Sequence, residues 1–236
     1  MNDRTPQRTR IKICGLTREQ DVDAAVHAGA DALGFVLYAA SARYVSPERA
    51  ALLARRLPPF VTPVLLLVNA DSAWVQRSLE LVPGATLQFH GDETPAQCQA
   101  LSAGRPYLRA ARIPLGDDAA RFDLVKFAQD FSQAQALLLD AYVEGYGGGG
   151  KAFNWSLLPP SVSVPLVLSG GLNAANVADG IASLRPRCPA LAVDISSGVE
   201  AVDAHGAPQK GVKDPLKIQQ FVAAVRAADC AFAESP

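Results

Sequence analysis

The 236-residue sequence lacks a long apolar run and an excess of charge of either sign. Its apolar runs, such as those at 64–68 and 136–139, are far shorter than the ~20 residues of a membrane-spanning helix. With 22 Lys and Arg against 23 Asp and Glu, the net charge is −1, so the chain has no basic excess for binding nucleic acid without sequence preference. We therefore expect neither a membrane nor a nucleic acid as partner, and we expect local groups to hold any anionic ligand.

Cysteine is scarce, and its spacing excludes two common kinds of site. The four cysteines, at positions 14, 98, 188 and 230, form no Cys-x-x-Cys pair, so zinc-binding and thioredoxin-like motifs are missing. Scattered thiols in a chain of this size are typical of the reducing cytosol rather than of a disulfide framework, and we expect a cytoplasmic protein. Three arginines among residues 1–10 have no apolar stretch after them, unlike a signal peptide. We expect residues 1–9 to form a disordered tail.

Hydrophobic residues make up 49% of the chain, enough for a sizeable core, and charged residues only 19%, too few for a disordered or coiled-coil chain. Short apolar runs predict strands at 10–14, 32–37, 61–68, 86–90, 106–111, 136–140, 165–169 and 191–195. Amphipathic stretches between them predict helices at 18–27, 47–55, 72–81, 95–101, 117–126, 174–184 and 214–227. Typical capping residues precede four of these helices, namely Thr17, Ser46, Thr94 and Asn173.

The alternation of strands and helices predicts βαβ units and a parallel sheet. Eight strands in one domain favour a closed (β/α)8 barrel over a doubly wound sheet, which commonly uses about five or six strands. No Pro-rich or Ser-rich linker and no run of charge divides the chain. We therefore expect one α/β domain, a single (β/α)8 barrel over residues 10–228, with a C-terminal tail over 229–236.

Alternation in the first strand places a lysine inside the expected barrel. Ile11 and Ile13 share the face that would meet the helices, whereas Lys12 and Cys14 share the face that would point inward. A buried ammonium is costly unless an anion pairs with it. Lys12 therefore indicates an anionic ligand or an inner carboxylate, unless its side chain extends to solvent at the rim.

Functional residues of such barrels lie at the C-terminal ends of the strands. There the sequence places Cys14, Arg43, His90, Asp92, Arg112, Asp140 and Asp194. A thiol and a carboxyl on opposite sides of a substrate could exchange protons with it, provided that a cation such as Lys12 stabilises the thiolate and that burial or nearby anions keep the carboxyl protonated. A buried structural cysteine is the alternative for Cys14. A lone histidine such as His90 is more often a hydrogen-bonded structural residue than a catalyst.

Two small-residue turns follow the last two expected strands. They contain Gly170 and Gly171 in the first and Ser197 and Gly198 in the second. Glycine lets backbone N–H groups approach an anion closely, and a helix N-terminus adds partial positive charge. Because the turns after strands seven and eight form the usual phosphate site of this fold, we predict such a site here, with two plain tight turns as the alternative.

A third glycine-rich segment, 145–152, matches two nucleotide-binding patterns in its letters alone. Ala152 stands where a P-loop needs Ser or Thr, and a dinucleotide site would need a following helix and an acidic residue about 20 positions on. No helix is expected directly after the segment, and no acidic residue lies between Lys151 and Ala178. We expect instead a mobile loop over the barrel mouth after the sixth strand, with a disordered connection as the alternative.

Together these segments resemble the phosphoribosylanthranilate isomerase family. The matching stretches occur in family order from about residue 10 to 226 and are 12–16, 34–35, 41–46, 87–93, 139–140, 145–155, 169–172 and 193–200. The combination is specific, although each glycine-rich piece alone is not. Three departures are modest: residues 37–41 lack the proline and second serine often found before the Arg-Tyr pair, Phe89 replaces leucine, and Asp92 extends a His-Gly-Glu pattern.

The resemblance implies an Amadori rearrangement in tryptophan biosynthesis, in which N-(5-phosphoribosyl)anthranilate becomes 1-(2-carboxyphenylamino)-1-deoxyribulose 5-phosphate. It implies Asp140 as the general acid that opens the ribose ring and Cys14 as the general base that removes the C2′ proton. It also implies Arg43 at the anthranilate carboxylate, Asp194 near the sugar, and the phosphate at Gly170, Gly171, Ser197 and Gly198. No cofactor and no metal are expected, because hydrogen only moves from C2′ to C1′ and the iminium accepts the electrons.

Two other functions stay open. A histidine-pathway isomerase performs the same rearrangement with two aspartates, and Cys14 in place of the first speaks against it. A non-catalytic phosphate-binding barrel would have lost the acid or the base, and both are present. The expected partner is the small phosphosugar–anthranilate substrate, and the expected assembly is a monomer or a homodimer.

Overall fold

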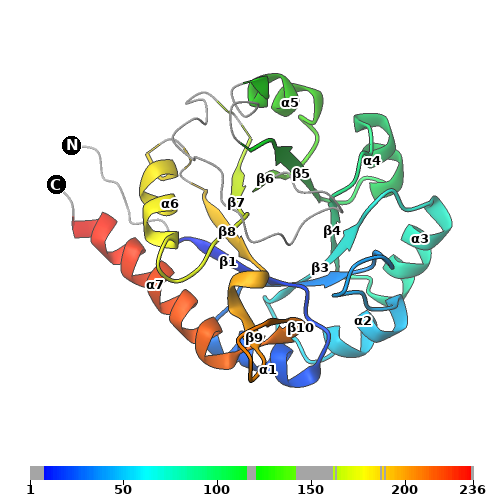
Figure 1. Cartoon of the computed structure of the whole chain (residues 1–236). Helices are drawn as coiled ribbons and strands as arrows, with labels where there is room; N and C mark the ends of the chain where they lie inside the picture. The colour runs from blue at the N-terminus through cyan, green and yellow to red at the C-terminus, as the bar shows by residue number, and fades with distance from the viewer. Residues whose placement is uncertain are drawn as a thin grey trace.

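A closed ring of parallel strands forms the centre of the molecule, and helices cover its outside (Figure 1). The computed structural model describes residues 8–115, 121–141, 162, 164–186, 188 and 190–234. The barrel strands follow chain order and are β1 (Arg10–Cys14), β2 (Ala32–Val36), β3 (Thr62–Leu67), β4 (Thr86–Phe89), β5 (Tyr107–Ile113), β6 (Ala136–Ala141), β7 (Leu166–Leu168) and β8 (Ala192–Ile195). The predicted (β/α)8 barrel of the α/β class is confirmed.

The helices outside the barrel agree with the predicted ones except at some of their ends. They are α1 (Glu19–Ala28), α2 (Pro47–Ala54), α3 (Ser72–Leu81), α4 (Pro95–Ser102), α5 (Leu124–Asp130), α6 (Val177–Leu184) and α7 (Pro215–Glu234). Ser46 and Thr94 cap α2 and α4 as predicted, because each hydroxyl oxygen accepts from a backbone N–H in the first turn.

Three predicted helix starts are wrong. Thr17 does not cap α1; its hydroxyl donates to the carbonyl of Gly211 at 2.7 Å. The helix expected from 174 begins at Val177, because the Asn173 side chain closes a separate turn by accepting from Ala175. The helix expected at 117–126 begins at Leu124, where Asp123 caps it, and residues 116–120 lie outside the described part of the chain.

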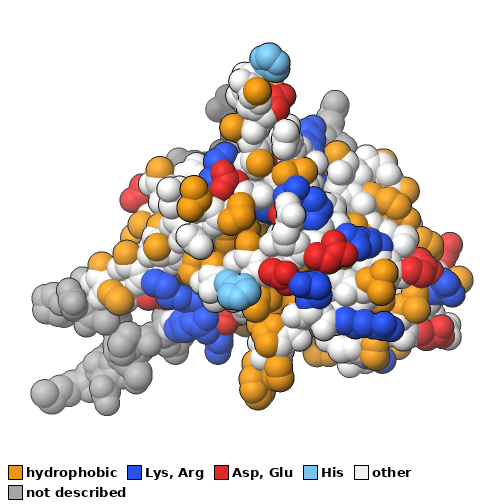
Figure 2. All heavy atoms as spheres, turned by 90° about the horizontal axis from the view of Figure 1, so that it is seen from below, with side chains coloured by type: hydrophobic (Ala, Val, Ile, Leu, Met, Phe, Trp, Pro, Cys, Tyr) orange, Lys and Arg blue, Asp and Glu red, His pale blue; other side chains and the backbone are white. Residues whose placement is uncertain are grey.

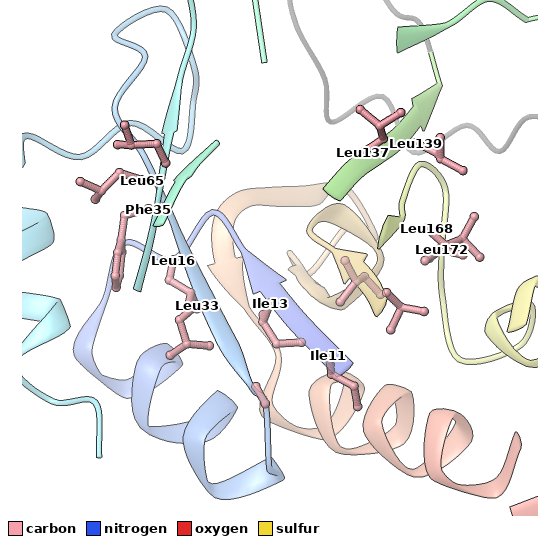
Figure 3. Close-up of a cluster of buried hydrophobic side chains, with 14 of the residues drawn as sticks. Ile11, Ile13, Leu16, Leu33, Phe35, Leu65, Leu137, Leu139, Leu168 and Leu172 are labelled. Carbon is pink, nitrogen blue, oxygen red and sulfur yellow. The ribbon is translucent and has the colours of Figure 1, made fainter. Parts of the chain in front are cut away.

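Alternation along each strand separates two layers of core. Residues of one parity, such as Ile11 and Leu33, lie fully buried between the strands and the surrounding helices (Figure 3). Residues of the other parity point into the barrel. There the small cluster of Ala110, Leu138 and Val167 lies below the polar residues at the C-terminal strand ends.

A hairpin between β8 and α7 is absent from the predicted elements. After a short 3-10 turn, Ser197–Val199, the chain forms β9 (Glu200–Val202) and β10 (Pro208–Lys213). The two strands are antiparallel, and Lys213 stands opposite Glu200. The hairpin lies beside α1 at the edge of the barrel (Figure 1), so it places two charged residues next to the loops after β1 and β2.

Positive and negative side chains are interspersed on the helices and form ion pairs. Figure 2 shows Lys and Arg side chains interspersed with Asp and Glu on one face. Three such pairs link neighbouring helices or the turn after α2, namely Arg49–Glu19, Arg56–Asp23 and Arg77–Glu48. Such exposed pairs each contribute at most ~1 kcal/mol to stability. None of the helices in the described part of the chain combines the length and hydrophobicity needed to cross a bilayer.

Both ends of the domain differ from the expected boundaries. Helix α7 continues past 228 to Glu234, so 229–234 are helical and not a tail. Asp229 on this helix accepts from the backbone N–H of Thr9 at 2.9 Å and pairs with Arg185 at 2.5 Å. Thr9 is fully buried, and its contact with Asp229 ties the start of β1 to α7. The rest of the expected N-terminal tail, residues 1–7, lies outside the described residues.

We expect Asp229→Ala to lower the free energy of unfolding by ~3 kcal/mol, because Arg185 then loses the carboxylate that compensates its largely buried charge. Asp130→Ala is the control: its partner Lys126 is exposed, and the expected change is below ~1 kcal/mol. Urea denaturation followed by circular dichroism measures both. Equal effects of the two substitutions would contradict a structural role for the Asp229 contacts.

Candidate active site

A layer of polar side chains closes the barrel interior at the C-terminal ends of its strands. β1 contributes Cys14, β6 contributes Asp140 and β8 contributes Asp194, and all three side chains have the inward parity. His90 and Ser169 follow directly after β4 and β7. The structure therefore gathers side chains predicted to carry chemistry within one ring, although they lie far apart in the sequence.

The inward lysine of β1 is paired with an inner carboxylate. The Nζ atom of Lys12 lies 2.8 Å from Asp194 Oδ1, and both side chains are buried. Burial disfavours the ammonium, but Asp194 and Cys14 outweigh it and raise the pKa of Lys12. The Ser169 hydroxyl donates to the other oxygen of Asp194 at 3.4 Å. Of the possibilities for Lys12, the structure thus shows an inner carboxylate and excludes a position at the solvent-exposed rim.

Cys14 lies in an apolar corner next to this ion pair. Its side chain packs with Val36, Leu66 and Val68. Burial raises the pKa of the thiol, while the ammonium of Lys12 opposes the shift. The expected cation is therefore present but does not outweigh burial. Gly34 leaves room for the sulfur, since a Cβ atom at that position would lie 2.6 Å from Sγ.

Asp140 is contacted by His90, which the sequence places at the end of the fourth strand and favours as a structural residue rather than a catalyst. The Nε2 atom of His90 lies 3.1 Å from Asp140 Oδ2, and the Nδ1 atom lies 3.0 Å from Nε2 of Gln88. An amide N–H of Gln88 that donates to Nδ1 leaves the proton of the neutral ring on Nε2, which then donates to the carboxylate. Gln88 and His90 are adjacent on the inward face of β4, which explains how they form one contact chain.

The two predicted phosphate turns are in contact. A Cβ atom on Gly198 would lie 2.0 Å from the carbonyl oxygen of Leu172, so the turn after β8 packs directly on the turn after β7. Gly170 and Gly171 both have positive φ, at 79° and 64°. Gly170 also lies close to the carboxyl group of Asp140, because a Cβ atom added at Gly170 would lie 3.0 Å from Asp140 Oδ1.

The helix N-terminus expected beside the predicted phosphate site begins later in the chain than predicted. Because α6 begins at Val177, several residues separate its first turn from Gly170 and Gly171. The expected donors to a phosphate are therefore the backbone N–H groups of the two turns and the hydroxyl of Ser197, rather than the N-terminus of α6. Asn176 supports the first turn by donating to the carbonyl of Gly171 at 3.0 Å.

Arg43 lies at the mouth in the loop after β2, in a charged group with two residues to which sequence reasoning assigned no role, Glu200 and Lys213. Its guanidinium binds the carboxylate of Glu200 in a bidentate pair at 2.7 and 2.8 Å. Lys213 approaches the same carboxylate at 3.3 Å. No pattern in the sequence indicates this group, because it depends on the register of the unpredicted hairpin.

Three further expectations concern parts of the site away from this group. Arg112 and Asp92, both placed at strand ends by the sequence, contact each other at 3.2 Å. Segment 145–152, with its expected closure over the mouth, lies outside the described residues. In the described ranges no group of three His, Cys, Asp or Glu side chains is arranged to hold a metal ion, and the four cysteines are free thiols.

Comparisons with known proteins agree with one another. The profile of the family described as N-(5'phosphoribosyl)anthranilate (PRA) isomerase matches residues 11–224. An N-(5'-phosphoribosyl)anthranilate isomerase of Methylibium petroleiphilum is 62% identical over 228 residues, which cover 97% of this chain and 99% of that protein. The crystal structure of phosphoribosyl anthranilate isomerase from Thermotoga maritima has 36% identity and a TM-score of 0.78, covering 93% of this chain and 99% of that one.

A further similar structure contains a ligand. It is a crystal structure of phosphoribosyl anthranilate isomerase in complex with reduced 1-(o-carboxyphenylamino)-1-deoxyribulose 5-phosphate. It has 33% identity and a TM-score of 0.74, and the match covers 93% of this chain and 99% of that one. The ligand of that protein combines a sugar phosphate with an aromatic carboxylate.

The raised pKa of the Cys14 thiol predicts a pH dependence. We expect its thiolate absorbance, taken as the difference between the wild type and Cys14→Ser, to appear above the pKa of an ordinary thiol, about 8.5. Lys12→Met should shift it to still higher pH, because the ammonium that opposes burial is removed. An ultraviolet pH titration measures both midpoints. A wild-type midpoint below about 8.5, or no shift in Lys12→Met, would contradict the expectation.

Proposed function

We propose that Cys14 and Asp140 carry the proton transfers of this enzyme, because the chain belongs to the N-(5'-phosphoribosyl)anthranilate isomerase family and isomerises N-(5'-phosphoribosyl)anthranilate in tryptophan biosynthesis. One observation carries the proposal: both side chains point into the barrel at the C-terminal ends of β1 and β6. A chain of contacts runs between them through Lys12, Asp194 and the turn after Ser169. A sugar held over this ring would meet a sulfur on one side and a carboxyl on the other.

Asp140 acts first, as the general acid. Protonated Asp140 gives its proton to the ribose ring oxygen, the C1′–O bond breaks, and the anilino nitrogen supplies the electron pair that forms an iminium. His90, at 3.1 Å, contacts the carboxylate that remains and stabilises it by donating a hydrogen bond. The acid therefore lies beside a group that can hold its charged form during ring opening.

Cys14 acts second, as the general base. The iminium acidifies the C2′–H bond, the thiolate takes that proton, and the bonding electrons form the enolamine double bond. Protonation at C1′ and loss of the C2′ hydroxyl proton then give the ketone, so that no external oxidant or reductant takes part. Burial raises the pKa of the thiol, which makes the thiolate a stronger base once formed, and Lys12 limits the cost of its charge.

The remaining groups bind the substrate in this proposal. The turns with Gly170, Gly171, Ser197 and Gly198 hold the phosphate, which is supported by their direct contact. Asp194 lies near the sugar, and Arg43 meets the anthranilate carboxylate, for which a planar guanidinium is suited.

The protein works in the cytoplasm without a cofactor in this proposal. Every residue assigned a role comes from one chain, so the enzyme can act as a monomer or as a homodimer.

We expect Cys14→Ala and Asp140→Asn each to lower kcat by about 10²- to 10⁴-fold, the usual contribution of a positioned acid or base. The fluorescence of the anthranilate adduct measures turnover. Matched controls are Cys230→Ala and Asp130→Asn, which change an exposed thiol on α7 and an exposed carboxylate on α5, outside the barrel. The binding of reduced 1-(o-carboxyphenylamino)-1-deoxyribulose 5-phosphate confirms that each variant is folded. A well-folded Cys14→Ala enzyme with near-normal kcat would refute the assignment.

The phosphate site predicts a different kinetic change. Gly198→Ala forces a Cβ atom against the carbonyl of Leu172, which separates the two turns, and we expect KM and the inhibition constant of inorganic phosphate to rise about tenfold or more. Gly84→Ala is the control, because no atom lies within 4 Å of its added Cβ. Steady-state kinetics with and without phosphate measure both constants. Unchanged phosphate inhibition in Gly198→Ala would place the phosphate elsewhere.

A further inference from the structure

Within the described part of the chain, the guanidinium of Arg43 is bound on one edge. Its Nε and Nη2 atoms donate to the two oxygens of Glu200, and among the described residues no acceptor is assigned to Nη1. The side chain packs over Gly15, where an added Cβ would lie 2.5 Å from Arg43 Cδ. Gly15 follows Cys14 directly, so this packing holds Arg43 beside the reacting centre. The free edge of Arg43 is thus available to a ligand at the mouth.

Glu200 is itself fixed by two contacts from β10. The backbone N–H of Gly211 donates to Glu200 Oε1 at 2.8 Å, and Lys213 Nζ lies 3.3 Å from the same oxygen. Lys213 is also anchored by donating to the carbonyl of Ser196 at 2.9 Å. Glu200 and Lys213 are 2% and 1% exposed, so water does not replace these contacts. The hairpin therefore clamps the carboxylate that in turn orients Arg43.

The charges of this buried group do not cancel. Arg43 and Lys213 contribute two positive charges, and Glu200 contributes one negative charge. A further acid, Asp21 on α1, accepts from the backbone N–H of Lys213, but its carboxylate is already bound by Arg18 at 2.6 and 2.9 Å. One positive charge is left over in a site with little access to water, where an uncompensated charge is costly. An anionic group placed against Arg43 would compensate it.

We propose that Glu200, held by Lys213, is the positioning residue that makes Arg43 selective for a carboxylate on the aromatic part of the substrate. Lys213 shares the charge of Glu200, so that the bidentate pair orients the guanidinium without neutralising it. The proposal rests on the proposed contact between Arg43 and the anthranilate carboxylate. It assigns to the β9–β10 hairpin a role in substrate selection rather than in proton transfer.

Two ligands test this proposal. One is reduced 1-(o-carboxyphenylamino)-1-deoxyribulose 5-phosphate, and the other is the same compound without the carboxyl group. The ratio of their dissociation constants, measured by calorimetry, gives the preference for the carboxylate. We expect Glu200→Gln to reduce this preference about tenfold or more, because a charge-assisted hydrogen bond in a buried site is lost when the donor is no longer oriented. The affinity for the ligand without the carboxyl group should change little.

Each other outcome overturns the proposal. Equal weakening of both ligands shows that Glu200 only stabilises the fold. A stronger preference for the carboxylate shows that Glu200 merely neutralises Arg43. Arg43→Gln separates the two assumptions: if it leaves the preference unchanged, the proposed contact of Arg43 fails. If Arg43→Gln abolishes the preference and Glu200→Gln preserves it, only the positioning role fails.

Two further variants guard against misfolding and nonspecific effects. The double variant Glu200→Gln with Lys213→Met removes one buried charge of each sign and leaves the net charge of the group unchanged. It should show the same loss of preference if Glu200→Gln alone does not fold. Glu48→Gln changes the same residue type in an exposed pair with Arg77 on α2 and α3, and it should leave the preference as in the wild type.

Discussion

The buried ion pair between Lys12 and Asp194 is the interaction on which the site depends. It joins β1 and β8, the first and last strands, at the seam where the barrel closes. Such a pair contributes little net stability, because desolvation of both charges offsets their attraction, but losing one partner leaves an uncompensated buried charge. Neither residue of the pair can therefore be replaced alone without leaving a buried charge at the seam. The pair also places an ammonium next to the sulfur of Cys14 and a carboxylate next to Ser169.

From this seam, hydrogen bonds and close packing continue around the ring in both directions. On one side they pass through Ser169 and Gly170 to Asp140, and then to His90 and Gln88 on β4. On the other side the chain beyond Cys14 turns at Gly15, against which Arg43 packs. β2 and β3 contribute only apolar side chains at this level, such as Val36 and Leu66. The mouth thus has a polar arc suited to a sugar phosphate and an apolar wall next to the sulfur.

In the proposed mechanism, burial has opposite consequences for the two ends of the substrate. At the reacting centre it raises the pKa of Cys14, so that a strong base is formed only with the help of neighbouring cations. At the aromatic end it preserves the charge imbalance of Arg43, Glu200 and Lys213. Burial disfavours the charged forms of both Glu200 and Lys213; it lowers the pKa of the lysine, whereas the hydrogen bond from Arg43 and the charge of Lys213 keep the pKa of the carboxylate low. In this proposal, the same exclusion of water favours proton transfer in one place and anion recognition in the other.

The sequence by itself determined the eight strands, the inward parity of Lys12 and Cys14, the place of Asp140 at a strand end, and the small residues of the two turns. These depend on periodicities of two and 3.6 residues and on local turn chemistry, which neighbouring residues decide. Local signals failed at Thr17, whose hydroxyl instead binds Gly211, and past 228, where Asp229 binds Thr9. Only the tertiary structure decided that Asp194 is the partner of Lys12, that His90 contacts Asp140, and that Glu200 and Lys213 hold Arg43. Each of these contacts joins distant segments, and their distances depend on barrel closure and hairpin register, which no short stretch of sequence encodes.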